Sequence, residues 1–208
     1  KKFMNKEYND YKTDLYSAFI YKTSLMIKEN GYSGLMTPFT WMFISSHEKL
    51  RKYLLREAMI SSLVELEYSA FEEATVPICT FVIQNQTEKT LGHYIRLEEF
   101  KGAELQPIKL RDSVVNPNAE YRYRKYSTSF SDIPGSPIAY WASEKVREIF
   151  RESPCLADIA EPKQGLATGD NNRFLRLWHE VNMYNIGFKY RSRDASKMSG
   201  KKWFPYNK

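Results

Sequence analysis

The chain has 208 residues, of which 42% are hydrophobic and 27% charged, and its formal net charge is +6. These values are ordinary for a globular chain of one large domain or slightly more, and they exclude wholesale disorder. The longest apolar stretch, residues 38–44, is far shorter than the roughly 18 residues of a membrane-spanning helix, so we expect no membrane segment. The chain starts with neither Met nor an apolar signal core, and Cys79 and Cys155 lack a partner motif. We therefore expect a piece of a longer cytoplasmic protein.

The first half of the chain predicts alternating helices and strands. The predicted elements are a buried helix with Asp14 near its N-cap and Gly31 just past its end, a strand over 32–37, a helix starting at a Ser45 and Glu48 capping box, and strands over 60–66 and 76–83. Helix, strand, helix, strand, loop and strand is the order of half a doubly wound sheet. The predicted fold class is therefore α/β, and Trp41 is expected in its core.

The pattern changes after residue 84. A short strand is predicted over residues 94–97, a turn-rich segment over 114–137 and a helix over 142–151. We place a boundary between residues 88 and 110 and the start of a second module near residue 155. The predicted domains are therefore 1–88, a connector over 89–150, and 151–208.

The positive charge is concentrated in the last part of the chain. Residues 1–169 contain equal numbers of basic and acidic side chains, whereas residues 170–208 contain nine basic and three acidic ones, interleaved with aromatic residues. Basic groups neutralise phosphates and aromatic rings stack on bases, so this segment favours a nucleic-acid surface. A solvated basic face beside a small core is the alternative.

Common catalytic motifs are absent from the sequence. The three histidines, His47, His93 and His179, are widely separated and no His-Glu-x-x-His or clustered cysteines occur, so we predict no metal site. No phosphate-binding glycine loop and no Gly-x-Ser-x-Gly elbow are present. The adjacent carboxylates Glu72 and Glu73 are expected to be solvated. The sequence therefore predicts no reaction centre of its own.

Several segments carry motifs of a known family. They are Asp-Leu-Tyr-Ser-Ala-Phe at 14–19, Gly-Leu-Met-Thr-Pro-Phe-Thr-Trp at 34–41, residues 46–55, and Ala-Phe-Glu-Glu-Ala-Thr-Val at 70–76. In order and spacing they resemble the later half of an adenine-specific DNA methyltransferase domain. Residues 165–176, with Thr-Gly-Asp-Asn, and 202–208, with Trp-Phe-Pro-Tyr, are similar to the large PglX methyltransferases of BREX phage-defence systems, and more loosely to fused restriction-modification enzymes.

The resemblance implies a fold and an activity for the parent protein. It implies the C-terminal half of a Rossmann-like class I methyltransferase sheet, followed by the start of a mixed α+β target-recognition region. The parent would transfer a methyl group from S-adenosylmethionine to the exocyclic amine of adenine in double-stranded DNA, with other phage-defence proteins as further partners. The family's glycine-rich donor turn and Asn-Pro-Pro-Tyr motif do not occur in this sequence, so the chain alone is expected to be inactive.

The resemblance also implies roles for individual residues, which occupy the positions of functional residues in the family. Phe19 matches the aromatic residue beside the adenine ring of the donor, with a place in the core as its alternative. Phe71 matches the aromatic residue that stacks on the flipped target base, which has lost its neighbours in the duplex. The residues expected to contact DNA are Asn171, Asn172, Arg173, Arg176, Lys201 and Lys202.

Two other functions remain open at this stage. In one, the α/β part is a scaffold and the chain is a non-catalytic module that binds DNA or a protein through its basic, aromatic tail. In the other, the parent is an RNA methyltransferase, which shares the fold and is disfavoured only by the motif resemblance.

Overall fold

The computed structural model describes residues 2–68, 76–86, 90–161 and 167–206. The chain divides into two compact units, Lys1–Ser153 and Pro154–Lys208, here named the sheet unit and the tail unit. The predicted connector, residues 89–150, supplies two strands to the sheet of the first unit. The division of roles among residues 1–88, 89–150 and 151–208 stays a prediction.

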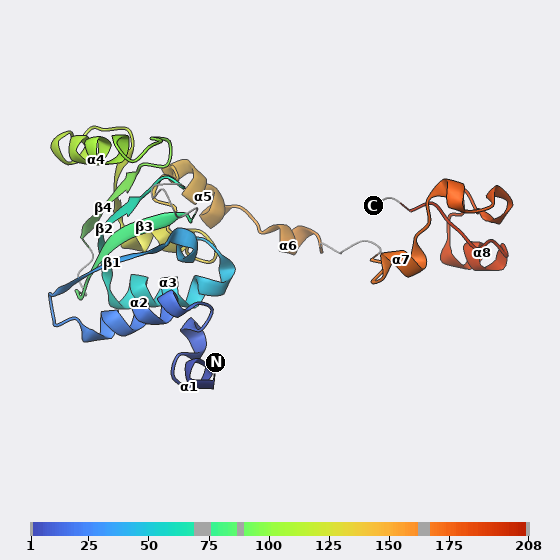
Figure 1. Cartoon of the computed structure of the whole chain (residues 1–208), viewed down its shortest axis with the longest axis horizontal. Coiled ribbons are helices and arrows are strands. Elements are labelled where there is room, and N and C mark those ends of the chain that lie inside the picture. Colours follow the sequence, from blue (N-terminus) through green and yellow to red (C-terminus); the bar gives the residue numbers. More distant parts are fainter. Residues whose placement is uncertain (1, 69–75, 87–89, 162–166, 207–208) are drawn as a thin grey trace. The chain divides into compact units, whose positions relative to one another are not determined.

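A mixed five-stranded sheet forms the centre of the sheet unit (Figure 1). Its strands are β1 (Tyr32–Pro38), β2 (Met59–Glu65), β3 (Ile78–Gln84), β4 (Leu91–Arg96) and β5 (Arg122–Tyr126). They lie in the order β1-β3-β2-β4-β5, with β2 and β4 parallel and every other neighbouring pair antiparallel. The α/β class is confirmed, and the sheet is mixed because β3 runs back between β1 and β2.

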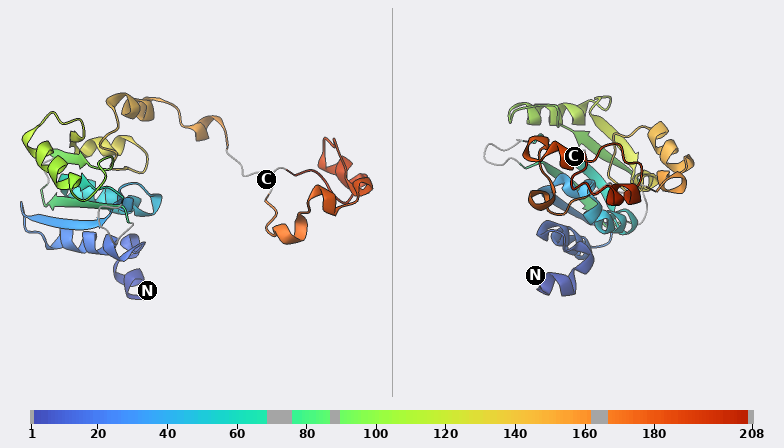
Figure 2. Two further views of the ribbon diagram at one scale, coloured as in Figure 1. Left: turned by 45° about the horizontal axis from the view of Figure 1, so that its top comes forward. Right: turned by 90° about the vertical axis from the view of Figure 1, so that its right-hand side faces the viewer.

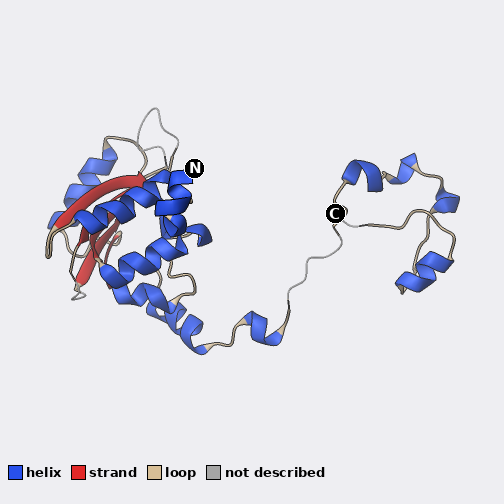
Figure 3. Ribbon diagram, turned by 90° about the horizontal axis from the view of Figure 1, so that it is seen from below, coloured by secondary structure: helices blue, strands red, loops and turns tan. Residues whose placement is uncertain are grey.

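Two of the helices of the sheet unit lie together on one side of this sheet. The helices of the sheet unit are α1 (Lys2–Glu7), α2 (Leu15–Met26), α3 (Glu48–Glu57), α4 (Leu105–Val115) and α5 (Glu144–Glu152). Figure 1 shows α2 and α3 on the same side of the sheet, and the Ser24 hydroxyl on α2 donates to the Tyr53 hydroxyl on α3 at 3.2 Å. Figure 2 shows α1 beyond α2, farther from the strands, and Figure 3 shows helices packed against the strands, seen from below. None of the helices in the described residues is long and apolar enough to cross a membrane.

The core lies between these helices and the sheet. In register across three strands, Leu63 faces both Phe81 and Tyr94, and all three side chains are buried. Trp41 is also buried, as predicted, with its ring centroid 4.9 Å from that of Phe81. Burial of large apolar side chains of this kind contributes about 1.5–3 kcal/mol each.

The helix termini confirm one predicted cap and correct another. Asp14 is the N-cap of α2, and its backbone N–H donates to the hydroxyl of Ser17. The predicted Ser45 and Glu48 capping box is wrong, because residues 45–47 form a 3-10 turn and α3 starts only at Glu48, without a side-chain cap. Helix α2 also ends at Met26, four residues before the predicted last residue Asn30. Ile27 already has an extended backbone, and the Asn85 side chain donates to its carbonyl at 2.9 Å.

A buried arginine joins distant parts of the sheet unit. Arg51 on α3 is 1% exposed, and its guanidinium donates to the carbonyls of Trp41 (2.8 Å), Ile44 (2.7 Å) and Gly135 (2.7 and 2.9 Å). A buried charge is tolerated only when its donors are satisfied, and here three carbonyls provide that. The contact binds the turn after β1 to the segment that leads into α5.

A second buried polar cluster lies where β2 and β4 end. The Glu65 carboxylate is 3% exposed and accepts a 2.6 Å hydrogen bond from the Tyr140 hydroxyl. Burial raises the pKa of Glu65 above its ordinary value of 4.5, while the Tyr140 hydrogen bond and then Arg96 oppose this increase. The Arg96 guanidinium itself lies 4.6 Å above the ring of Trp141.

We predict that Arg51→Lys lowers the free energy of unfolding by about 2–4 kcal/mol. A single ammonium cannot replace the planar fork that reaches carbonyls on both segments, so buried acceptors lose their partners. Urea unfolding followed by intrinsic fluorescence measures the change. Arg56→Lys, on the exposed side of the same helix, is the matched control and should change stability by less than about 0.5 kcal/mol. Equal effects of the two substitutions would contradict the role given to Arg51.

The Glu65 carboxyl predicts a specific pH dependence. Its pKa is raised in the folded state, so its contribution to stability is present below the unfolded value near 4.5 and is lost as the pH rises through the raised value. The difference in unfolding free energy between the wild type and Glu65→Gln should fall over this range, by about 1.4 kcal/mol for every tenfold difference in proton affinity between the folded and unfolded chains. Urea unfolding at several pH values tests this, and a difference that is constant with pH would refute it.

Candidate nucleic-acid interface

The tail unit is built from short elements and main-chain contacts. Its helices are α6 (Leu156–Ile159), α7 (Asn171–Phe174) and α8 (Arg193–Met198). Ile186 and Trp203 form an isolated parallel bridge, with the Gly187 amide donating to the Trp203 carbonyl at 2.8 Å. This bridge closes the loop that contains α8. Gly187 is the only buried residue among the described residues of the tail unit, so its side chains form almost no core.

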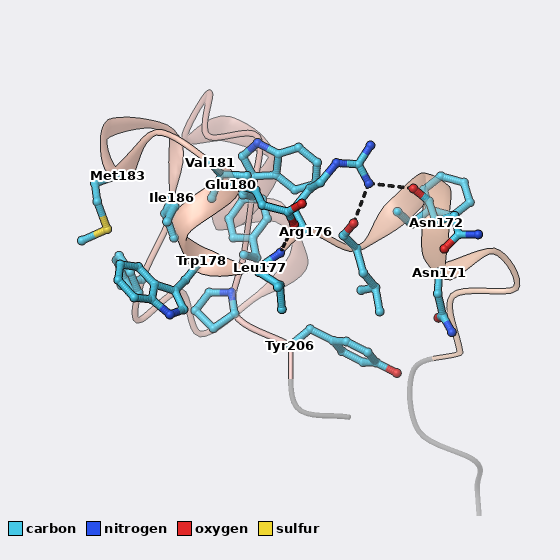
Figure 4. A pocket seen from close by; sticks show the side chains of 16 residues that line it. Asn171, Asn172, Arg176, Leu177, Trp178, Glu180, Val181, Met183, Ile186 and Tyr206 are labelled. Atoms are coloured by element: carbon cyan, nitrogen blue, oxygen red, sulfur yellow. Dashed lines mark hydrogen bonds between the residues drawn. The ribbon is translucent and has the colours of Figure 1, made fainter.

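An aromatic pocket of about 950 Å³ lies in the tail unit (Figure 4). Apolar side chains from three short elements line it, together with the chain that returns after α8. They include Phe174, Leu177, Trp178, Met183, Trp203 and Tyr206. Trp178 is 75% exposed and Met183 61% exposed. A contiguous patch of exposed apolar side chains is typical of an interaction surface, and these side chains line one pocket.

Polar groups converge on one side of this pocket. The Arg176 guanidinium donates to the carbonyls of Asn172 (2.7 Å) and Leu175 (2.6 Å) and lies 5.9 Å from the ring centre of Trp203. Figure 4 shows Arg176 reaching back over the helix that carries Asn172. The Glu180 carboxylate accepts from the Leu177 amide at 2.6 Å. Arg176 therefore stabilises the pocket wall as well as supplying positive charge.

The structure brings together three of the six predicted DNA contacts. Asn171, Asn172 and Arg176 line the aromatic pocket, and the Asn171 side chain accepts a hydrogen bond from Thr168. Arg173 does not line it, and its guanidinium lies 5.1 Å from the ring centre of Phe174.

The two predicted lysines also lie outside the pocket lining. The ammonium of Lys201 donates to the Tyr184 carbonyl, and that of Lys202 lies 5.5 Å from the ring centre of Trp203. Contact of any of the six residues with DNA stays a prediction.

Of the two residues with a predicted role in methyl transfer, Phe19 and Phe71, the structure describes only Phe19. Phe19 lies on α2 and is 59% exposed, so it is not a core residue in this structure and its ring is available for stacking. Phe71 lies outside the described residues. Both roles stay predictions. Among the described residues, no group of three or more His, Cys, Asp or Glu side chains could hold a metal ion.

The sequence predicts a role for the aromatic residues of the tail, Trp178 among them, but not for the aliphatic part of the pocket lining. Leu177 and Met183 carry neither charge nor an aromatic ring, so the sequence alone gives no reason to separate them from a small core. The available signal was the density of large apolar residues in a segment without helical or strand periodicity. Without a helix or strand, these apolar residues do not share one face that could pack against a core.

Comparison with known proteins identifies the relationship of the chain. Residues 1–71 match the model of the Eco57I restriction-modification methylase family. The whole chain is 38% identical over 212 residues to the adenine-specific methyltransferase PglX of Lacticaseibacillus casei (strain Zhang). It is 31% identical over 223 residues to the adenine-specific methyltransferase BrxX of Escherichia coli O9:H4 (strain HS).

The chain is homologous to the PglX and BrxX adenine-specific methyltransferases. This confirms the resemblance seen in the sequence motifs. The chain covers 17% of the length of that PglX and 16% of that BrxX, so it corresponds to about a sixth of each relative. Among solved structures, it is similar to a type I restriction-modification methyltransferase subunit from Streptococcus thermophilus, with 16% identity and a TM-score of 0.49 over 64% of this chain and 32% of that one.

We predict that Arg176→Ala and Arg173→Ala have different effects on the tail unit. Arg176 binds two carbonyls beside the pocket, so its loss should lower local stability by about 1 kcal/mol. The Arg173 guanidinium lies at the surface against the ring of Phe174, without a carbonyl partner among the described residues, and its loss should cost less than about 0.5 kcal/mol. Hydrogen exchange of the Gly187 and Trp203 amides measures both. Equal exchange rates in the two variants would show that Arg176 has no structural role.

Proposed function

We propose that this chain is part of a site-specific DNA adenine methyltransferase of the phage-defence type. The observation that carries the proposal is the homology to PglX and BrxX along the entire chain rather than over one motif. The reaction forms a bond between the exocyclic nitrogen of adenine and the methyl carbon, breaks the carbon–sulfur bond of S-adenosylmethionine and releases a proton from the amine. In this proposal the sheet unit is the later half of the class I methyltransferase sheet.

Each unit has a separate task in this proposal. The ring of Phe19 on α2 is 59% exposed and is therefore suited to stack on the adenine of S-adenosylmethionine. Phe71 stacks on the extruded target base. The tail unit contacts double-stranded DNA with the basic residues named above. The chain alone lacks the Asn-Pro-Pro-Tyr motif and is expected to have no activity.

One observation favours a second candidate function for the tail unit. Leu177, Trp178 and Met183 are each more than 60% exposed at the aromatic pocket, and apolar groups of this size bind protein surfaces as well as bases. In that case the pocket holds another protein of the defence system, and the sheet unit serves as a scaffold. An affinity of the chain for DNA that stays constant as the salt concentration rises would favour this second function.

We predict that Phe19→Ala in the full-length parent weakens S-adenosylmethionine binding about tenfold. Loss of one stacking contact with a base costs about 1–3 kcal/mol, which is tenfold or more in affinity. Isothermal titration calorimetry with the donor measures the change. Leu15→Ala is the matched control, because Leu15 lies one turn earlier on α2 and is equally exposed at 59%.

Two results would overturn parts of this proposal. A parent protein that binds no S-adenosylmethionine would refute the enzymatic function. Equal weakening by Phe19→Ala and Leu15→Ala would show that the α2 face acts through packing, and the specific role of Phe19 would be lost while the methyltransferase function stands.

A further inference from the structure

A second pocket in the tail unit has a different chemical character from the first. It has a volume of about 550 Å³, and its lining includes Lys189, Arg191 and Arg193. No acidic residue is part of the lining, although Asp194 is adjacent in sequence to Arg193. The aromatic pocket, in contrast, is lined by one basic and one acidic residue, Arg176 and Glu180. The charged side chains in the lining of the second pocket are therefore all basic.

The local backbone fixes the shape of this basic pocket. Tyr190 and Phe204 pack edge to face, with ring centroids 5.8 Å apart, directly over Gly187. A Cβ at Gly187 would lie 2.7 Å from a ring atom of each, so only glycine allows this close approach. Lys189 has a φ of 62°, in the left-handed region that non-glycine residues rarely adopt. The chain turns sharply there and brings Lys189 to the same concavity as Arg191.

Two hydroxyl groups complete the lining. The Ser192 hydroxyl accepts from the Ala195 amide at 3.1 Å, which leaves its own proton to donate. The Ser196 hydroxyl donates to the Arg193 carbonyl at 2.8 Å, which holds that part of the wall in place. Two guanidinium forks, one ammonium and a hydroxyl donor form a set suited to a tetrahedral oxyanion, since arginine matches phosphate oxygens in a bidentate manner.

The basic pocket and the aromatic pocket adjoin each other. Phe204 and Pro205 line both and form a common wall. The backbone of a duplex places each charged phosphate next to the less polar face of a deoxyribose, and the two adjoining pockets present the matching pair of environments. A free phosphate ion would use only the basic pocket and would leave the adjoining aromatic surface without a role.

We propose that Lys189, Arg191 and Arg193 form a phosphate-binding pocket that takes a backbone phosphodiester of DNA. The site is separate from the six tail residues predicted from sequence, and it positions the duplex without reading its bases. The proposal rests on the proposed DNA-binding function and names the group that the tail unit binds. Its affinity depends on charge, and therefore on salt.

The test uses the complete 208-residue chain. Binding of a fluorescent duplex of about 20 base pairs is followed by anisotropy at several salt concentrations, for the wild type and for Lys189→Gln/Arg191→Gln/Arg193→Gln. Each phosphate contact contributes about 0.9 to the slope of log affinity against log salt, so the triple variant, which loses the one phosphodiester contact of the pocket, should lose about 0.9 from the slope and at least about tenfold in affinity at low salt. Circular dichroism and the fluorescence of the four tryptophans check that the variant is folded.

A second triple variant controls for net charge. Lys22→Gln/Lys28→Gln/Lys101→Gln removes the same charge from exposed positions of the sheet unit, and it should leave the slope within about 0.5 of the wild type. Inorganic phosphate, added at constant ionic strength, distinguishes the source of the ligand. It should compete with DNA for the wild type and have no effect on the residual binding of the pocket variant.

The outcomes separate the two proposals. A wild-type chain that does not bind DNA overturns both the pocket assignment and DNA contact by the tail unit. Normal DNA binding with equal slopes for the pocket and control variants overturns the pocket alone. Inorganic phosphate that binds the wild type and not the pocket variant, without any effect on DNA affinity, would make it a site for a small phosphate and refute the phosphodiester assignment.

Discussion

The sheet unit depends on one buried guanidinium. Arg51 binds carbonyls from two segments that are more than eighty residues apart in sequence, and its four hydrogen bonds fix residue 135 against the turn after β1. The Ile138 amide then donates to the Met42 carbonyl at 2.9 Å. As a result Tyr140 stacks on Tyr94 with ring centroids 5.2 Å apart, and its hydroxyl reaches Glu65. The buried guanidinium of Arg51 needs hydrogen-bond acceptors, and the carbonyl of Gly135 is one of them. This requirement holds the irregular segment from Gly135 to Tyr140 against the sheet.

The parts of this fold that follow local periodicity could be predicted, and the long-range polar contacts could not. The spacing of apolar residues gave α2, α3 and the first four strands. Strand β5 fell in a segment read as turns, because Arg-Tyr-Arg-Lys-Tyr has no apolar alternation and pairs with β4 through its backbone. Arg51 reads as a surface residue of an amphipathic helix, since the carbonyls that bury it come from elsewhere in the chain. Phe19 on helix α2 is the opposite case, because the apolar sequence of this helix predicts a buried element and yet the side chain of Phe19 is exposed.

The candidate site was predictable in composition and not in geometry. Charge counting located the basic segment, but it could not divide that segment into an aromatic pocket and a basic one. That division depends on the bridge between Ile186 and Trp203 and on the missing side chain of Gly187, which lets two rings close over the backbone. Arg176 shows what composition leaves out. Its charge predicts a contact with DNA, whereas its hydrogen bonds to two carbonyls can be seen only in the structure.

The two units also differ in what holds them together, and this difference bears on function. The sheet unit buries large aromatic and aliphatic side chains, whereas among the described residues of the tail unit only Gly187 is buried. A segment of about 50 residues with so little buried apolar area gains little from the hydrophobic effect, so its own cohesion is low. A ligand that contacts both pockets would add binding energy to the ordered form and stabilise it. Binding of such a ligand would therefore be linked to ordering of the tail unit, whose side chains are the least packed of the described residues.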